Sequence, residues 1–459
     1  MYNKTGYTML KIEKNRTNCI SYLEQQLKSI PIERIAKECN FQKRKARKIT
    51  AKNYLLGFFM MLNEVGGKSY NDWAMKISFL IKRRISKQAI NKKMNETQIE
   101  FLKKILRFLI GEKIKNKRDI KNENLKMFRN VIVEDSTNIQ LNDRLYKEYP
   151  GNNGGNKKTK NAIMRIQTAF NITKNKFMRF EITSYRENDL KYSEKIFQIV
   201  QKGDLLIRDL GYFVIKIFRK LNEDGVFYIS RFKKKINVFL REKDENVIDL
   251  AKMLRKRGNL DIEVFLGEKE KLPVRLIALP VTEEIASKRR MKAKENKDGR
   301  YKHTKEYYYL LGWELFITNV GKHKITPKDI MHLYYLRWRI ESIFKTWKSY
   351  LRITETSKIG SKIRIDSYIL CMLIFITILQ VHMYNFFLGK RNSSETFRNK
   401  ISLLKFTKYI ANNMMNMFFY KMKQCKALDI LSFENISYYC LYDIRKDRQN
   451  YFQKLYSLS

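Results

Sequence analysis

Proline, cysteine and histidine are scarce in this sequence, and each scarcity excludes a class of protein. With 5 Pro and 18 Gly in 459 residues, collagen-like and low-complexity architectures are excluded. The 5 Cys are widely scattered and form no Cys-x2-Cys pair, so neither a disulfide framework nor a zinc finger is predicted. The 4 His show no ligand spacing, and no Gly-x4-Gly-Lys-Ser/Thr loop occurs, which leaves zinc-dependent hydrolysis and ATP-driven chemistry unsupported.

The first residues lack the apolar core of a signal peptide, so we expect a protein of the reducing cytoplasm. One segment, residues 367–389, carries no Asp, Glu, Lys or Arg and is long enough for a membrane-spanning helix. Gln380, His382 and Asn385 interrupt its second half, and the sequence has no second stretch of this kind. We therefore interpret it as a helix buried in a domain core; a membrane protein, the alternative, would sediment with lipid.

Acidic residues are also few, with 46 Asp and Glu against 94 Lys and Arg, and the net charge is +48. So large a charge repels itself in the free protein and indicates a polyanionic partner, nucleic acid. The codon bias of an AT-rich genome, which favours Lys, Asn and Ile, accounts for part of the excess. Hydrophobic residues at 44% and aromatic residues at 13% are enough to build cores, so a mainly disordered protein is excluded.

Residues 1–125 are predicted to be helical and basic, since apolar residues recur at helical spacing in stretches such as 96–110. Ser86 stands where an N-cap would lie, and the helix after it would show a polar face to solvent. That face consists of Lys87, Gln88, Asn91 and Lys92. Two interpretations stay open: a helix that enters the major groove of DNA, or an ordinary solvated amphipathic helix.

From about residue 129 the pattern changes to β-branched and aromatic runs separated by turn-rich segments. Three strands, a helix and a fourth strand are predicted, at 129–141, 162–172, 176–185, 187–200 and 204–210. This is the opening order of a ribonuclease-H-like fold, although several α+β folds share it. Residues 221–320 are again strand-rich, apart from a basic segment, 287–305, that is predicted to be a loop or arm. The helical period returns from residue 326 and continues to the end.

The segment 331–353 is the most informative, because at 100° per residue it divides into a polar and an apolar stripe. The polar stripe holds Tyr334, Arg337, Glu341, Lys345 and Lys348. The apolar stripe, predicted to face the core, holds Leu336, Ile340, Ile343, Phe344 and Trp347. One glutamate thus lies among three cations and a tyrosine. The alternative is that Glu341 and Lys345 form an i,i+4 pair of the kind found on many exposed helices.

The order Tyr-x2-Arg-x3-Glu-x6-Lys in the polar stripe resembles the signature of one family, the DDE transposases of bacterial insertion sequences, in the insertion sequence four group. Tyr334, Arg337, Glu341 and Lys348 match that signature without a gap. In this family two aspartates at strand ends complete the set of acids.

Two aspartates of this chain stand in similar settings. Asp135 shares a strand face with two valines and precedes Ser136-Thr137. Asp209 ends the run LLIRDL and precedes Leu-Gly-Tyr, whereas Asp204 opens the same strand and is predicted to belong to the turn. A strand-end aspartate taken alone is more often a turn residue. Three acids in the family's order favour the functional interpretation.

The resemblance implies a mixed α+β protein with a ribonuclease-H-like core, interrupted between Asp209 and Glu341 by a β-strand insertion. It also implies that Asp135, Asp209 and Glu341 bind two Mg²⁺ ions, for which Mn²⁺ substitutes, and that the chain cuts and joins DNA.

The resemblance also suggests DNA contacts. Family members contact DNA through the Tyr, Arg and Lys of the signature, here Tyr334, Arg337 and Lys348, and Lys345 lies on the same stripe. Trp313 resembles the tryptophan that stacks on a flipped base in some members, but a tryptophan in an alternating strand is as often a core residue.

On this basis the chain is predicted to divide into five parts. They are 1–125, helical and DNA-end-binding; 126–220, the first part of the catalytic core; 221–320, the β-rich insertion; 321–395, the second part of the core; and 396–459, helices that dimerise. The predicted partners are double-stranded DNA, as terminal inverted repeats and as target, and a second copy of the chain, at a bacterial nucleoid. Two alternatives stay open: a catalytically silent DNA-binding relative, and an RNA-processing nuclease on the same fold.

Overall fold

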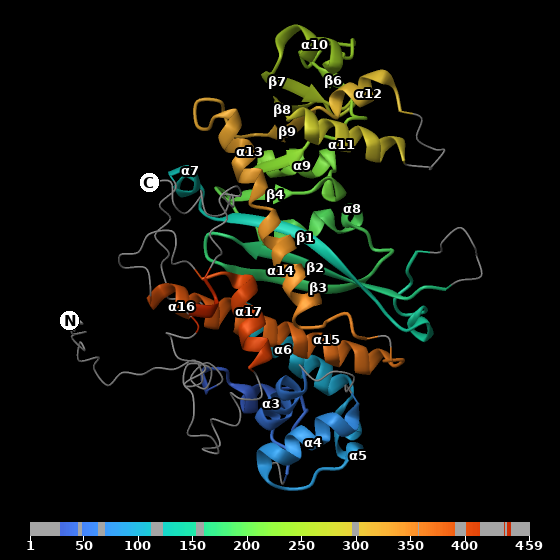
Figure 1. Ribbon diagram of the computed structural model, residues 1–459, viewed down its shortest axis with the longest axis vertical. Helices are drawn as coiled ribbons and strands as arrows, with labels where there is room; N and C mark the ends of the chain where they lie inside the picture. The colour runs from blue at the N-terminus through green and yellow to red at the C-terminus, as the bar shows by residue number, and fades with distance from the viewer. Residues whose placement is uncertain are drawn as a thin grey trace, which may run out of the picture.

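The computed structural model describes residues 28–44, 48–62, 69–111, 123–152, 160–295, 303–356, 358–390, 401–413, 436 and 438–441. Its centre is a nine-stranded sheet with the strand order β3-β2-β1-β4-β5-β9-β8-β7-β6. Helices from both ends of the chain gather beyond the β3 edge, and further helices flank the strands (Figure 1). The chain is thus a mixed α/β protein, as predicted.

The first five strands have the connectivity of the predicted fold class. They are β1 Val131–Gln140, β2 Ile163–Asn171, β3 Lys176–Ser184, β4 Leu205–Arg208 and β5 Phe227–Arg231. Strands β1, β2 and β3 pair antiparallel, whereas β4 pairs parallel with both β1 and β5. This combination of order and direction is that of a ribonuclease-H-like sheet, and the predicted fold class is confirmed.

The connection between β3 and β4 is less regular than the helix predicted over 187–200. It forms a single turn, α8 Asp189–Tyr192, and a 3₁₀ segment, η2 Ser193–Gln198. Arg208 donates a hydrogen bond of 2.6 Å to the Ser193 carbonyl oxygen, which a continuous α-helix would use itself. After β4 and the short η3 Leu210–Tyr212, α9 Ile215–Glu223 leads to β5.

The strands between residues 221 and 320 extend the same sheet rather than forming a separate one, because β9 Trp313–Thr318 pairs with both β5 and β8. The remaining elements here are β6 Val238–Phe239, α10 Leu250–Arg257, β7 Leu260–Leu266, β8 Leu272–Pro280, α11 Glu283–Lys294 and α12 Lys305–Leu310. The prediction of a loop over 287–305 is wrong in its first part. There α11 is a helix, held by buried Ala286 and by an ion pair of Arg289 with Glu314. Residues 296–302 lie outside the described part.

The helices before the sheet are α2 Ile32–Glu38, α3 Ala51–Met61, α4 Tyr70–Ile81, α5 Lys87–Lys93, α6 Glu96–Gly111 and α7 Glu123–Lys126. Helix α5 begins as its sequence predicts, since the Ser86 hydroxyl accepts a hydrogen bond from the Ala89 N–H. Its predicted polar face is exposed along its whole length, at Lys87, Gln88, Asn91 and Lys92.

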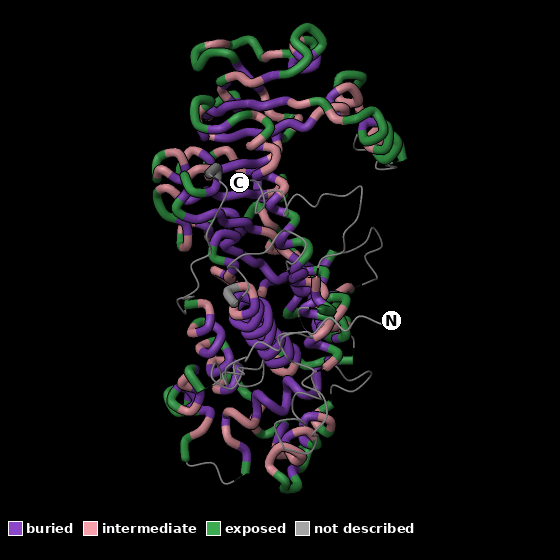
Figure 2. The backbone as a smooth tube through the Cα atoms, turned by 60° about the vertical axis from the view of Figure 1, so that its left-hand side comes forward, coloured by how far each residue is buried: buried purple, intermediate pink, exposed green. Residues whose placement is uncertain are grey.

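The long apolar segment forms α15 Lys362–Thr377, a π-helical turn η4 Ile378–Met383, and α16 Tyr384–Lys390, followed by α17 Leu403–Asn412. Within the described residues, Lys362–Leu388 is the one helix long and apolar enough to cross a membrane, and 94% of its most apolar window is buried inside the protein. Figure 2 shows it as a buried rod. The interpretation as a core helix is confirmed. The predicted C-terminal helices of 396–459 lie mostly outside the described residues.

The helix predicted over 331–353 is divided by a tight turn into α13 Pro327–Tyr335 and α14 Trp338–Ser349. At this turn the Arg337 N–H bonds to the Tyr334 carbonyl and the Ile340 N–H bonds to the Arg337 carbonyl, a spacing of three residues. The apolar stripe nevertheless faces the core as predicted. Its members Leu336, Ile340, Ile343, Phe344 and Trp347 are all buried.

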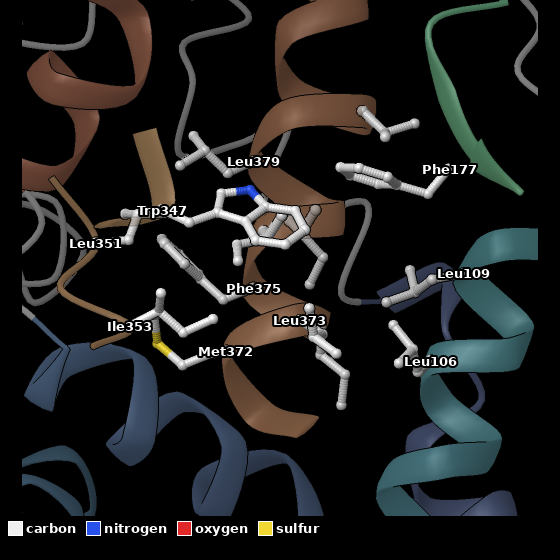
Figure 3. Packing of buried hydrophobic residues seen from close by; sticks show 14 of the residues in the cluster. Leu106, Leu109, Phe177, Trp347, Leu351, Ile353, Met372, Leu373, Phe375 and Leu379 are labelled. Atoms are coloured by element: carbon white, nitrogen blue, oxygen red, sulfur yellow. The ribbon is translucent and has the colours of Figure 1, made fainter. Parts of the chain in front are cut away.

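Trp347 anchors α14 to the apolar helix. Its ring lies among apolar side chains that include Phe177, Phe375 and Leu379 (Figure 3). Its indole Nε1 donates a hydrogen bond of 3.0 Å to the Gln380 side-chain oxygen. The Gln380 amide in turn donates to the hydroxyls of Thr346, at 2.6 Å, and Thr407 on α17, at 3.2 Å. A polar residue of the apolar helix thus joins three helices.

We expect Gln380→Leu to lower the free energy of unfolding by about 1–3 kcal/mol, because it leaves the buried indole N–H unpaired and removes the hydrogen bonds to two buried hydroxyls. Urea unfolding followed by circular dichroism measures this. The matched control is Gln88→Leu, which changes a glutamine on the exposed face of α5. Equal effects of the two substitutions would contradict the role of Gln380.

Candidate active site

Three acidic residues from different elements lie at one place on the sheet. Asp135 is in the middle of β1, Asp209 directly follows β4, and Glu341 is in the first turn of α14, which packs on β1. Strands β1 and β4 are parallel neighbours, and the last residue pair of their ladder is Glu134 with Arg208. The next residue of each strand is an aspartate, so Asp135 and Asp209 come side by side. Figure 1 shows α14 beside these strands.

Arg337 and Tyr334 hold the three acids together. The Arg337 guanidinium lies 3.2 Å from Asp135 through Nη1 and 2.6 Å from Glu341 through Nη2. The Tyr334 hydroxyl donates a hydrogen bond of 3.2 Å to Asp209. Arg337 and Tyr334 are buried, whereas the Glu341 side chain is 46% exposed. The site therefore opens to solvent on the Glu341 side.

The electrostatics of the site are those of crowded acids around one internal cation. Burial raises the pKa of Asp135 to about 7, and Asp209 and Glu341 raise it as well, while Arg337 lowers it. Burial lowers the pKa of Arg337, but Tyr334 and the three carboxylates more than offset this and raise it, so the guanidinium stays charged. Burial raises the pKa of Tyr334, which therefore remains a hydrogen-bond donor at neutral pH.

The donor set is suited to a hard divalent cation, since all three side chains offer carboxylate oxygens. Within the described residues, however, no three acidic, histidine or cysteine side chains already surround one point closely enough to coordinate a metal ion. Arg337 lies between Asp135 and Glu341 and provides the positive charge there. A cation bound by both residues would take over this charge compensation from Arg337.

The other residues predicted for the site are not bonded to the three acids. Lys345 and Lys348 are exposed on α14, at the next turns after Glu341. Trp313 is half-buried at the start of β9, where its ring centroid is 6.2 Å from that of Tyr309. Among the described residues, these three side chains form no hydrogen bond, ion pair or ring contact with the carboxylates.

The structure also places three basic residues beside Tyr334 that the sequence analysis does not predict for the site: Arg231, Lys234 and Arg289. The Arg231 guanidinium, at the end of β5, lies 5.4 Å from the centre of the Tyr334 ring and 3.7 Å from the Glu314 carboxylate. Arg289 pairs with the same Glu314, and burial, together with Arg289 and Arg231, lowers the pKa of Lys234 to about 8. Three cations thus share one carboxylate next to the site. The run Arg-Phe-Lys-Lys-Lys at the end of a predicted strand was the available signal.

Comparisons with known proteins give a consistent result. The family described as Transposase DDE domain matches residues 126–376, more than half of the chain and including all three acids. The transposase for insertion sequence element IS231F of Bacillus thuringiensis subsp. israelensis is 25% identical over 394 residues, which are 82% of each chain. The transposase for insertion sequence element IS1151 of Clostridium perfringens is 27% identical over 364 residues, 74% of this chain and 76% of that one.

A solved structure is similar to the chain over most of its length. It is a cryo-EM structure of the piggyBac transposase synaptic complex with hairpin DNA, with a TM-score of 0.44 and 11% sequence identity. The match covers 96% of this chain and 89% of that one.

We expect Asp135→Asn to stabilise the protein above pH 7 but not near pH 4. A carboxyl whose pKa rises from 3.8 to about 7 on folding binds more protons in the folded state, so its contribution to stability falls as pH increases through this window. Asparagine removes this penalty, which we put at roughly 2–4 kcal/mol at pH 8.

Urea unfolding at pH 4 and pH 8, in buffer with a metal chelator, tests this pH dependence. Glu148→Gln, at an exposed position, is the control and should change stability at neither pH. A destabilised Asp135→Asn protein at pH 8 would contradict the electrostatic account.

Proposed function

Because the chain belongs to the Transposase DDE domain family, we propose that Asp135, Asp209 and Glu341 are the carboxylates with which it cuts and joins DNA. The chain is a DNA transposase similar to those of insertion sequences. The observation that carries the residue assignment is the convergence of three acids, from β1, the end of β4 and α14, on Arg337 and Tyr334.

We further propose that these carboxylates bind two Mg²⁺ ions, for which Mn²⁺ substitutes. The chemistry of the donor set supports this, as does the burial of Asp135 beside two other acids, which calls for more positive charge than one guanidinium. When bound, the ions would activate the attacking oxygen and stabilise the departing one in an in-line displacement at phosphorus.

Arg337 has two successive roles in this proposal. In the free protein it neutralises Asp135 and Glu341 and keeps them close together. If bound cations neutralise those carboxylates, the planar guanidinium of Arg337 would be free to contact the oxygens of a phosphate through two N–H groups. Lys345 and Lys348, exposed on the following turns of α14, would contact phosphates farther along the same strand.

The partners we propose are the terminal inverted repeats of the chain's own element and a target duplex. The exposed polar face of α5 is suited to the major groove of the repeat, since lysine, glutamine and asparagine bind phosphates and base edges. Trp313 would stack on a flipped base beside the cut. Two copies of the chain would hold the two ends of the element, and the protein would act in the bacterial cytoplasm at the nucleoid.

We expect Glu341→Gln to abolish cleavage while leaving binding of the repeat unchanged, because the substitution removes a ligand charge but almost no volume. Cleavage of a labelled duplex that carries the element's own terminal repeat, in Mg²⁺ or Mn²⁺, should fall at least about 100-fold. Glu355→Gln is the control, since Glu355 is exposed beyond the end of the same helix and pairs with Arg352.

The outcomes of this cleavage experiment separate the alternatives. Equal cutting by wild type and Glu341→Gln would remove Glu341 from the site. Tight binding without cutting by either protein would indicate a catalytically silent DNA-binding relative. A preference for RNA over duplex ends would indicate an RNA-processing nuclease.

We expect Lys348→Ala to weaken binding of the repeat and to reduce the slope of log K against log salt by about one, as the loss of one phosphate contact does. Titrations at several salt concentrations measure the slope. Lys202→Ala, in the turn before β4 at the opposite end of that strand from Asp209, is the control and should leave it unchanged. An unchanged slope for Lys348→Ala would count against its phosphate contact.

A further inference from the structure

Each of the two aspartates at the site directly follows a buried charged residue. Glu134 precedes Asp135 and has no exposed surface, and Arg208 precedes Asp209 and is 1% exposed. The two are register partners in the parallel pair β1–β4. Because side chains alternate along a strand, both point to the sheet face opposite to that of the aspartates. Glu134 and Arg208 therefore lie on the face of the sheet that is opposite to the three acids.

The pair is held by short contacts on every side. Arg208 lies 2.6 Å from Glu134 through Nη2, and its Nε donates to the same carboxylate at 2.8 Å. Arg179 on β3 donates to the other Glu134 oxygen at 2.8 Å. Arg208 also donates to the Ser193 hydroxyl, which donates in turn to the carbonyl of Tyr212 at 3.1 Å. The network thus reaches the backbone on both sides of Asp209.

A second ion pair joins the same two strands at their other end. Arg129, before β1, contacts Asp204, before β4, at 2.8 Å through Nε and at 2.6 Å through Nη2. Asp204 is fully buried and also accepts a hydrogen bond of 2.8 Å from Asn130. Asp204 is thus a structural residue at the strand start, as its sequence setting predicts, and it provides a matched control for the pair at the site.

We propose that the Glu134–Arg208 pair is a positioning device that aligns Asp135 with Asp209 for cation binding. The inference rests on the proposed function of these aspartates. A buried ion pair adds little to stability compared with apolar residues. However, its two charges neutralise each other only when the two strands are aligned so that the side chains meet. Any slip or splaying of the strand ends would separate the two charges in a water-free interior. The alignment that avoids this cost is the one in which the aspartate carboxylates lie together.

Glu134→Gln in the full-length chain tests the proposal, because it removes the charge and keeps the shape. Mn²⁺ binding without DNA, followed by the electron paramagnetic resonance signal of free Mn²⁺, should weaken about 10-fold or more. The Mg²⁺ concentration for half-maximal cleavage should rise by a similar factor. Asp204→Asn should change both values less than threefold, although its stability to urea falls comparably. Arg208→Lys keeps the positive charge but loses the paired N–H groups of the guanidinium. This variant should fold and should weaken Mn²⁺ binding by a smaller factor.

Each result has a defined meaning. Equal shifts for Glu134→Gln and Asp204→Asn would show general destabilisation and overturn the proposal, as would unchanged Mn²⁺ binding in both Glu134→Gln and Arg208→Lys. If Glu134→Gln does not fold, Arg208→Lys against Asp204→Asn decides the matter by itself. The proposed function fails separately, if wild type does not cut or if Asp135→Asn binds Mn²⁺ as wild type does.

Discussion

Carboxylates that are gathered away from water repel one another, and the arrangement of this site depends on the positive charge that Arg337 places among them. Its guanidinium contacts Asp135 and Glu341, and the adjacent Tyr334 donates to Asp209. Even so, burial and the neighbouring acids leave Asp135 with a raised pKa. The single positive charge of Arg337 therefore does not balance the negative charge of the three carboxylates, and this imbalance favours the binding of further cations.

The position of Arg337 depends in turn on how its helix is anchored. The tight turn between α13 and α14 lies at Arg337, and from there α14 extends to Trp347, whose indole is fixed by Gln380 of the apolar helix. The polar residues that make this helix unsuited to a membrane are thus partly explained. Gln380 binds two other helices, and Asn385 exchanges hydrogen bonds with Asn175 in the turn between β2 and β3.

The sheet supplies the other half of the site. Two ion pairs, Arg129–Asp204 and the fully buried Glu134–Arg208, join β1 and β4 at their two ends, and the aspartates emerge directly beyond the second. Because β9 pairs with both β5 and β8, the strands between residues 221 and 320 continue the same sheet. This continuity brings Arg231, at the end of β5, next to the Tyr334 ring, with Lys234 and Arg289 near it.

Features that depend on near neighbours in the chain could be predicted from the sequence alone. Strand alternation, the stripes of 331–353, the Ser86 cap and the placement of Asp204 in a turn are set by local periodicity and backbone chemistry, and the spacing of Tyr334, Arg337 and Glu341 indicated the family. The sequence did not reveal which charges meet. Arg337 and Asp135 are 202 residues apart, and Arg208 and Glu134 are 74 apart. The Arg337–Asp135 pair depends on how α14 packs on β1. The Arg208–Glu134 pair depends on strand order and register, which only the folded sheet decides, because a one-residue shift sends every side chain to the opposite face.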